Sequence, residues 1–204
     1  MRKVAAFDFD GTLVPGDSLL PFLVRVCGRR RAATALGVLG PSIGVALARG
    51  GARRDAAKAA LVSRLLRGLP AAEVARAGEA FASVLLPRAR PDMLARVGWH
   101  RDSGHELVLV SASLSVYLEP LGAMLGFDHV LATGLEVGQD GLLTGRLLGA
   151  NVRGPEKAVR VREWLGADLC ELWAYGDSAG DHDLFALAQW PYLVTRRGTL
   201  RPWP

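Results

Sequence analysis

Near its start this 204-residue chain reads Val4-Ala5-Ala6-Phe7-Asp8-Phe9-Asp10-Gly11-Thr12-Leu13. The short apolar run at residues 4–9 predicts a β-strand, and its two acids fall where that strand ends. In open α/β sheets, ligands bind outside the carboxyl ends of the strands. The stretch therefore predicts a buried first strand and a polar site directly after it.

After residue 91 the sequence alternates between apolar runs and longer amphipathic segments. The apolar runs predict strands over residues 107–110, 129–132, 171–175 and 192–194, and a hairpin with arms at 135–137 and 142–147. The other segments predict helices over residues 92–103, 115–125 and 155–165. Strands that alternate with helices form a parallel sheet covered on both faces. We therefore expect an α/β fold with a doubly wound, mostly parallel, Rossmann-like sheet.

Residues 15–87 have a different, all-helical pattern. Apolar spacings of three and four predict amphipathic helices over residues 53–67 and 71–86. A charge-free run at residues 32–48 predicts two short helices, because the pair Gly40-Pro41 should break a helix there. We therefore expect a core made of residues 1–14 and 88–204, with residues 15–87 inserted after the first strand as a helical cap.

The basic residues are unevenly distributed along the chain. There are 25 Lys+Arg against 20 Asp+Glu, and the sequence is 50% apolar, which is typical of a folded globular protein. Residues 18–54 contain no acid and seven arginines, namely Arg25, Arg29, Arg30, Arg31, Arg49, Arg53 and Arg54. This excess predicts an anionic partner, a phosphorylated small molecule or a lipid, rather than nucleic acid. The alternative interpretation is a solvated basic surface.

The charge-free run of 17 residues approaches the roughly 20 that span a bilayer. Its glycines, proline and hydroxyl side chains argue against spanning, so peripheral membrane contact is the alternative that stays open. The start, Met1-Arg2-Lys3, is followed by too short an apolar run for a signal peptide, and Cys27 and Cys170 form no CxxC pair. We therefore expect a cytoplasmic protein with reduced thiols, either a monomer or a homodimer.

Four polar clusters are placed around the predicted strands: three directly follow a strand, and Lys157 precedes the strand at 171–175. They are Asp8 with Asp10, then Ser111-Ala112-Ser113, then Lys157, and finally Asp177 with Ser178 and Asp181. Because two neighbouring carboxylates repel each other, a cation is expected between Asp8 and Asp10. Asp177, backed by Asp181 and Asp183, would complete an all-oxygen site of the kind that suits Mg²⁺. Magnesium is therefore the expected cofactor.

These clusters together predict phosphoryl-transfer chemistry. One carboxylate of the Asp8 and Asp10 pair would attack phosphorus and form an aspartyl-phosphate, while the other would protonate the leaving oxygen and later activate water. The phosphate would be bound by Ser111, by Lys157 and by the backbone around them and around the glycine turn, at Gly11, Thr12 and Ala112.

The same motifs carry a resemblance to a known family. DFDGTLV from Asp8, LVSAS ending at Ser113, DGLLTG from Asp140, GPEK ending at Lys157 and YGDSAGD ending at Asp181 resemble the haloacid dehalogenase superfamily, in its phosphoserine-phosphatase-like subclass with a helical cap. The resemblance implies that Asp8 is the nucleophile and Asp10 the general acid/base, with the Asp10 backbone carbonyl also on Mg²⁺. It further implies that Asp8 and Asp177 bind the metal and that Asp181 and Ser178 hold the groups around the metal in place.

The substrate is less closely specified than the chemistry. Gly11, Asp17 and Gly180 stand where phosphoserine phosphatases usually have Ser, Glu and Asn. We therefore keep a lipid phosphate, such as phosphatidylglycerophosphate or lysophosphatidate, beside phosphoserine and histidinol phosphate, with Asp17, Arg53 and Arg54 as candidate specificity residues. Two other functions stay open: a phosphotransferase that uses the same intermediate, and a module that only binds phosphate esters.

Overall fold

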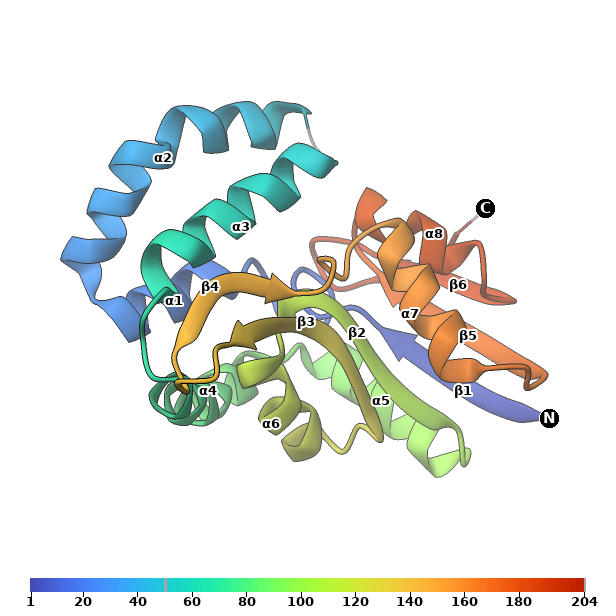
Figure 1. Cartoon of the computed structure of the whole chain (residues 1–204). Coiled ribbons are helices and arrows are strands. Elements are labelled where there is room, and N and C mark those ends of the chain that lie inside the picture. The colour runs from blue at the N-terminus through green and yellow to red at the C-terminus, as the bar shows by residue number, and fades with distance from the viewer. Residues whose placement is uncertain (50, 204) are drawn as a thin grey trace.

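The structure, a computed structural model, describes residues 1–49 and 51–203, and of residues 41–49 it describes only the backbone. A seven-stranded sheet lies at its centre in the order β4-β3-β2-β1-β5-β6-β7 (Figure 1). The strands are β1 (Arg2–Phe7), β2 (Glu106–Leu114), β3 (His129–Val137), β4 (Leu143–Leu148), β5 (Cys170–Gly176), β6 (Trp190–Val194) and β7 (Leu200–Pro202). Only the edge pairs β3 with β4 and β6 with β7 are antiparallel among the described strands. The predicted doubly wound, mostly parallel α/β fold is confirmed.

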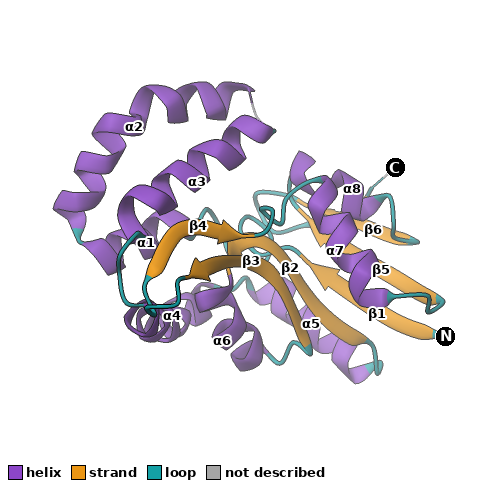
Figure 2. Ribbon diagram, in the orientation of Figure 1, coloured by secondary structure: helices purple, strands orange, loops and turns teal. Residues whose placement is uncertain are grey.

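Strand β1 is buried on both of its faces, as its apolar sequence predicts. Val4 and Ala6 belong to one hydrophobic cluster, and Ala5 and Phe7 belong to another. Because successive side chains of a strand point to opposite faces, the two clusters form two separate layers of core. The first layer includes side chains of α7 (Pro155–Leu165) and α8 (His182–Phe185), and the second includes side chains of α5 (Pro91–Asp102) and α6 (Ser115–Leu125). Figure 2 shows these helices beside the sheet.

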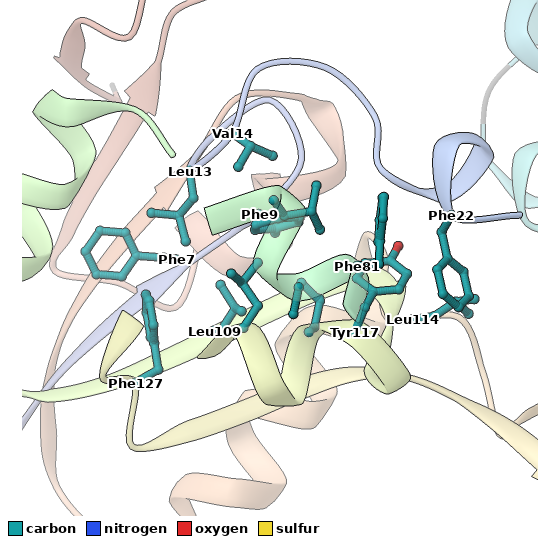
Figure 3. Packing of buried hydrophobic residues seen from close by; sticks show 14 of the residues in the cluster. Phe7, Phe9, Leu13, Val14, Phe22, Phe81, Leu109, Leu114, Tyr117 and Phe127 are labelled. Carbon is teal, nitrogen blue, oxygen red and sulfur yellow. The ribbon is translucent and has the colours of Figure 1, made fainter. Parts of the chain in front are cut away.

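The predicted helical insert corresponds to α1 (Leu19–Cys27), α2 (Arg29–Arg49), α3 (Ala52–Leu66) and α4 (Ala71–Leu85), followed by the short 3-10 helix η1 (Leu86–Arg88). Helices α2 and α3 lie side by side, with α3 next to strand β4, whereas α4 lies beside α6 (Figure 1). Figure 3 shows that Phe22 of α1, Phe81 of α4 and Tyr117 of α6 pack in one group. The core and the insert thus share a hydrophobic cluster, and the boundaries 15–87 of a separate cap stay a prediction.

The structure corrects three sequence predictions. The expected break at Gly40-Pro41 is wrong, because α2 continues through it. An internal proline removes one backbone hydrogen bond and bends a helix without always ending it, and α2 is visibly bent in Figure 1. The predicted strands 129–132 and 135–137 are one strand, β3, which pairs first with β2 and then with β4. The short elements β7, η2 (Ala179–Asp181) and α8 were not expected, since so few residues carry no clear period.

Among the described residues, no helix combines the length and the apolar character that crossing a membrane requires. The second half of the apolar run, residues 41–48, has side chains outside the described part of the chain. Peripheral membrane contact through this run therefore stays a prediction.

Candidate active site

The carboxyl ends of β1, β2 and β5 meet at one edge of the sheet and carry the predicted polar side chains. The parallel pairing of β1 with β5 continues one residue beyond β1, where the Asp8 amide donates to the Tyr175 carbonyl at 2.8 Å. Asp8 therefore lies next to the loop that begins at Asp177, and Ser111 lies in the second half of β2 on the other side of β1.

Lys157 is enclosed between two carboxylates. Its Nζ lies 2.6 Å from Asp8 Oδ1 and 2.5 Å from Asp181 Oδ1, and its side chain is 3% exposed. Burial raises the pKa of Asp8 to about 7, with Lys157 opposing the shift and Asp181 adding to it. Burial alone would lower the pKa of Lys157, but the two carboxylates outweigh it, so that this pKa is raised. Lys157 thus remains a cation at the floor of the site.

Asp181 connects this ion pair to the loop after β5. Its Oδ2 accepts hydrogen bonds from the backbone amides of Asp177 and Ser178 at 3.2 and 3.1 Å, and from Ser178 Oγ at 3.2 Å. Ser178 Oγ in turn accepts from the Gly180 amide, which completes a capping box. Asp181 is fully buried and fixes the position of Asp177 relative to Lys157.

Three carboxylates at this edge could hold a divalent cation. Oxygens of Asp8, Asp177 and Asp181 all lie within 4.8 Å of one another, and an all-oxygen donor set suits Mg²⁺. The side chains grouped here include Asp181 and do not include Asp10. Burial and the Asp181 charge raise the pKa of Asp177, which is the effect of a nearby carboxylate that a cation would reverse.

Gly11 gives Asp177 the space to enter this group. A Cβ at Gly11 would lie 2.2 Å from Asp177 Oδ2, and the glycine has a φ of 82°. Both the close approach and the left-handed backbone require glycine. The amides of Gly11 and Thr12 donate to Val14 and Phe9 carbonyls within the turn, so the predicted amide cradle for phosphate does not form from these two groups.

The Asp10 carboxylate is hydrogen-bonded to two serines and is not part of the group formed by the three other carboxylates. Its Oδ2 accepts from Ser113 Oγ at 2.5 Å and from Ser18 Oγ at 3.0 Å. Burial raises the pKa of Asp10 to about 6, while these two hydroxyls oppose the shift. A carboxyl that titrates near neutrality is suited to giving and taking a proton.

A cavity of about 890 Å³ opens above these groups. Ten of the predicted residues line it, namely Asp8, Asp10, Gly11, Asp17, Arg54, Ser111, Ala112, Lys157, Asp177 and Ser178. Three other predicted residues are not among those that line the cavity: Thr12 and Asp181 are buried, and Arg53 is exposed to solvent. Asp17 has a structural task as well, because its Oδ1 accepts from the amides of Leu19 and Leu20 at the start of α1.

The structure also brings residues to the cavity that the sequence did not predict. Those with polar side chains are Asp55, Lys58, Arg90, Asn151, Arg153 and Arg196. Asp55 and Lys58 share one face of α3 with Arg54, and this spacing could have marked them. No feature of the sequence near Asn151 marks it as a site residue, and it reaches the cavity because of the course of the loop after β4.

Comparisons with known proteins identify the family of the chain. A family model described as haloacid dehalogenase-like hydrolase matches residues 5–186. The chain belongs to this family. The expected membership is therefore confirmed, and the chain is a hydrolase of the haloacid dehalogenase type with the predicted motifs inside the matched region.

Two relatives and one solved structure illustrate the similarity of this haloacid dehalogenase-like hydrolase to known proteins. Protein CicA of Caulobacter vibrioides is 36% identical over 186 residues, which are 91% of this chain and 82% of that protein. Phosphoserine phosphatase SerB2 of Mycobacterium tuberculosis is 30% identical over 190 residues, covering 92% of this chain and 42% of that protein. A crystal structure of a protein with unknown function from Bordetella pertussis Tohama I has a TM-score of 0.78 and 29% identity, covering 93% of this chain and 88% of that chain.

Proposed function

We propose that this hydrolase is a Mg²⁺-dependent phosphatase that cleaves a phosphomonoester through an aspartyl-phosphate on Asp8. The observation that carries this proposal is the position of Asp8 in the cavity, ion-paired with Lys157 and grouped with Asp177. A nucleophile, a fixed cation and an acidic group for a metal are the parts that phosphoryl transfer needs. The relative SerB2, which is named as a phosphatase, supports this class of reaction.

In the first step, a carboxylate oxygen of Asp8 attacks phosphorus while the bond from phosphorus to the alcohol oxygen breaks. Asp10 gives its proton to that oxygen, so the product leaves as a neutral alcohol. In the second step, water attacks the phosphorus of the aspartyl-phosphate and gives a proton to Asp10. Inorganic phosphate leaves, and both carboxyl groups return to their starting states.

Asp8 and Asp177 would hold Mg²⁺ through their side chains, and Asp10 through its backbone carbonyl. When bound, the ion offsets the negative charge that the carboxylates and the phosphoryl oxygens bring together. Lys157 contributes a second positive charge, and its position is fixed by Asp181.

Ser111 and Ala112 form the side of the site opposite Asp177. Ser111 Oγ accepts from the Ser113 amide at 3.2 Å, which leaves the Ser111 hydroxyl hydrogen available for a phosphoryl oxygen. Because Asp8 and Asp10 are both required only for bond cleavage, a module that merely binds phosphate esters is the weaker interpretation.

The part of the cavity farther from Asp8 has a mixed character that bears on the substrate. Leu19, Leu20, Leu36 and Leu61 line it together with charged side chains of α3. The leucines favour an alcohol with an apolar portion, which keeps a lipid phosphate as the second candidate substrate class. A phosphotransferase would use the same first step with an alcohol acceptor in place of water.

The test is phosphate release from purified protein with phosphoserine, histidinol phosphate, lysophosphatidate and phosphatidylglycerophosphate, each with Mg²⁺ and with a chelator. We expect Mg²⁺-dependent release from at least one ester and no release by Asp8→Asn. Asp102→Asn, an exposed change on α5, is the matched control and should keep the wild-type rate. Undiminished release by Asp8→Asn would overturn the proposal, and added acceptor alcohols reveal any transfer product.

A further inference from the structure

Three buried hydroxyl groups form a hydrogen-bonded group at one oxygen of Asp10, two of them directly and the third through Ser18. Besides the Ser18 and Ser113 contacts with Asp10 Oδ2, Ser18 Oγ lies 3.0 Å from the Tyr117 hydroxyl and 3.1 Å from Ser113 Oγ. The exposed fractions are 1% for Ser18, 4% for Ser113 and 0% for Tyr117. These residues come from the start of the helical insert, the end of β2 and helix α6, so only the folded chain unites them.

The number of hydroxyl hydrogens in this group determines which residue donates each hydrogen bond. Each hydroxyl has one hydrogen to donate, and Asp10 Oδ2 accepts from both serines. Tyr117 then donates to Ser18, so the chain of hydrogen bonds runs from Tyr117 through Ser18 to Asp10. Oδ2 is thereby occupied as an acceptor, and a proton carried by Asp10 resides on Oδ1. Oδ1 is itself buried and accepts no hydrogen bond from the described part of the chain, and Asp10 is among the residues that line the cavity.

We propose that Ser18, Ser113 and Tyr117 are positioning residues that hold the Asp10 carboxyl in the orientation in which it protonates the leaving group. The proposal rests on the phosphatase function above and adds which esters depend on it. An alcohol that is a poor leaving group needs a well-placed proton, whereas an acidic phenol leaves without one. The three hydroxyls therefore matter for alkyl-like esters and hardly matter for activated aryl esters.

The packing around the hydroxyls explains how they hold a fixed geometry. The rings of Phe22 and Tyr117 lie 4.9 Å apart, and Phe81 lies 5.5 Å from Phe22 and 5.4 Å from Tyr117 (Figure 3). Phe22 stands one helical turn after Ser18 on α1, so this aromatic group fixes the start of the helix against α6. Buried hydroxyls in such surroundings cost stability unless they are hydrogen-bonded, and Asp10 is the acceptor that the two serines share.

The test compares leaving groups on one enzyme. Ser18→Ala, Ser113→Ala and Tyr117→Phe are assayed with Mg²⁺ on a series of aryl phosphates from p-nitrophenyl phosphate to esters of weakly acidic phenols. For the serine variants we expect kcat to fall about 10- to 100-fold on the least acidic phenol and less than about threefold on p-nitrophenyl phosphate. Tyr117→Phe should show the same trend with a smaller loss. Ser103→Ala, which removes an exposed hydroxyl on the far side of α5, is the control and should not change the series.

The outcomes separate this inference from the proposed function. If every ester loses activity by the same factor in variants with wild-type Tm, the hydroxyls are only structural and the inference is wrong. If a serine variant fails to fold, Tyr117→Phe decides the matter through the same comparison. If the wild-type protein hydrolyses none of the esters, the phosphatase function itself is wrong. A further expectation is that Ser113→Ala costs nothing more once Asp10→Asn is present, since the hydroxyl then has no acid to position.

Discussion

Lys58 on helix α3 donates to Asn151 Oδ1, in the loop after β4, at 2.6 Å. Its ammonium also donates to the Ala112 carbonyl beside Ser111, and Asn151 Nδ2 donates to Asp55 Oδ1 at 2.6 Å. The helical insert is thus joined by one side chain both to strand β2 and to the loop after β4. Burial lowers the pKa of Lys58 to about 8, while Asp55, Asp17 and Asp10 oppose the shift.

Lys58→Met should weaken substrate binding more than it slows the chemistry. The methionine keeps the length of the side chain but loses hydrogen bonds from a charged donor, which are worth about 1.5–3 kcal/mol. We expect KM to rise about tenfold with kcat within about threefold of wild type. The measurement is steady-state kinetics on the best substrate of the release screen. Lys3→Met, at a half-exposed position on β1, is the control. An unchanged KM would show that this contact does not shape the cavity.

Gly11→Ala should disrupt the metal group directly. The added Cβ would meet Asp177 Oδ2 at 2.2 Å, and alanine also pays about 1–2 kcal/mol for the left-handed backbone. The matched control is Gly28→Ala, because Gly28 has a φ of 80° and no atom within 4 Å of an added Cβ. In thermal unfolding, Gly28→Ala should lose only the backbone contribution to stability, and Gly11→Ala should lose more because of the contact with Asp177. Only Gly11→Ala should require much more Mg²⁺ for half-maximal activity, and equal Mg²⁺ requirements would contradict the role given to the close approach.

His100 should make the stability of the protein depend on pH. It is fully buried, with Nδ1 2.8 Å from His105 Nδ1 and Nε2 2.8 Å from the Tyr175 hydroxyl. Burial, with the neighbouring His105 and Arg96, lowers the pKa of His100 from 6.5 to about 3. Between these values the unfolded chain binds the extra proton, so the free energy of unfolding falls as the pH drops below 6.5, by up to about 1.4 kcal/mol per pH unit.

Urea unfolding of wild type and His100→Gln at pH 7 and pH 5 measures this dependence. The variant is expected to be less stable at pH 7, because the Tyr175 hydroxyl loses its partner, but to lose less stability between the two pH values. His129→Gln, at a partly exposed position paired with Glu106, serves as the comparison. A variant whose stability falls with pH as steeply as that of the wild type would rule out His100 as the source.

Most of the architecture could be predicted because its signals are local. Residues 4–7 are apolar without alternation, which indicates burial on both faces, and the structure places them in two hydrophobic clusters. Lys157 and Asp177 were predicted as site residues from a local signal as well, namely their positions before and just after the strand at 171–175. The prediction of a helix break rested on the single pair Gly40-Pro41 and was wrong. The helical turns on both sides of this pair outweigh its preference to end a helix, so α2 continues through it.

The sequence by itself determined which chemical groups meet at the sheet edge, since the carboxyl ends of parallel strands converge whatever the loops do. Only the tertiary structure decided how each group is held. Lys157 donates a hydrogen bond to Asp181, Ser18 and Ser113 donate to Asp10, and Lys58 donates to Asn151. These pairs join residues 8 to 103 positions apart, and those of Ser18 and Lys58 depend on how the helical insert packs on the sheet. No periodicity or short motif records that packing, because it is a property of the filled core rather than of any one segment.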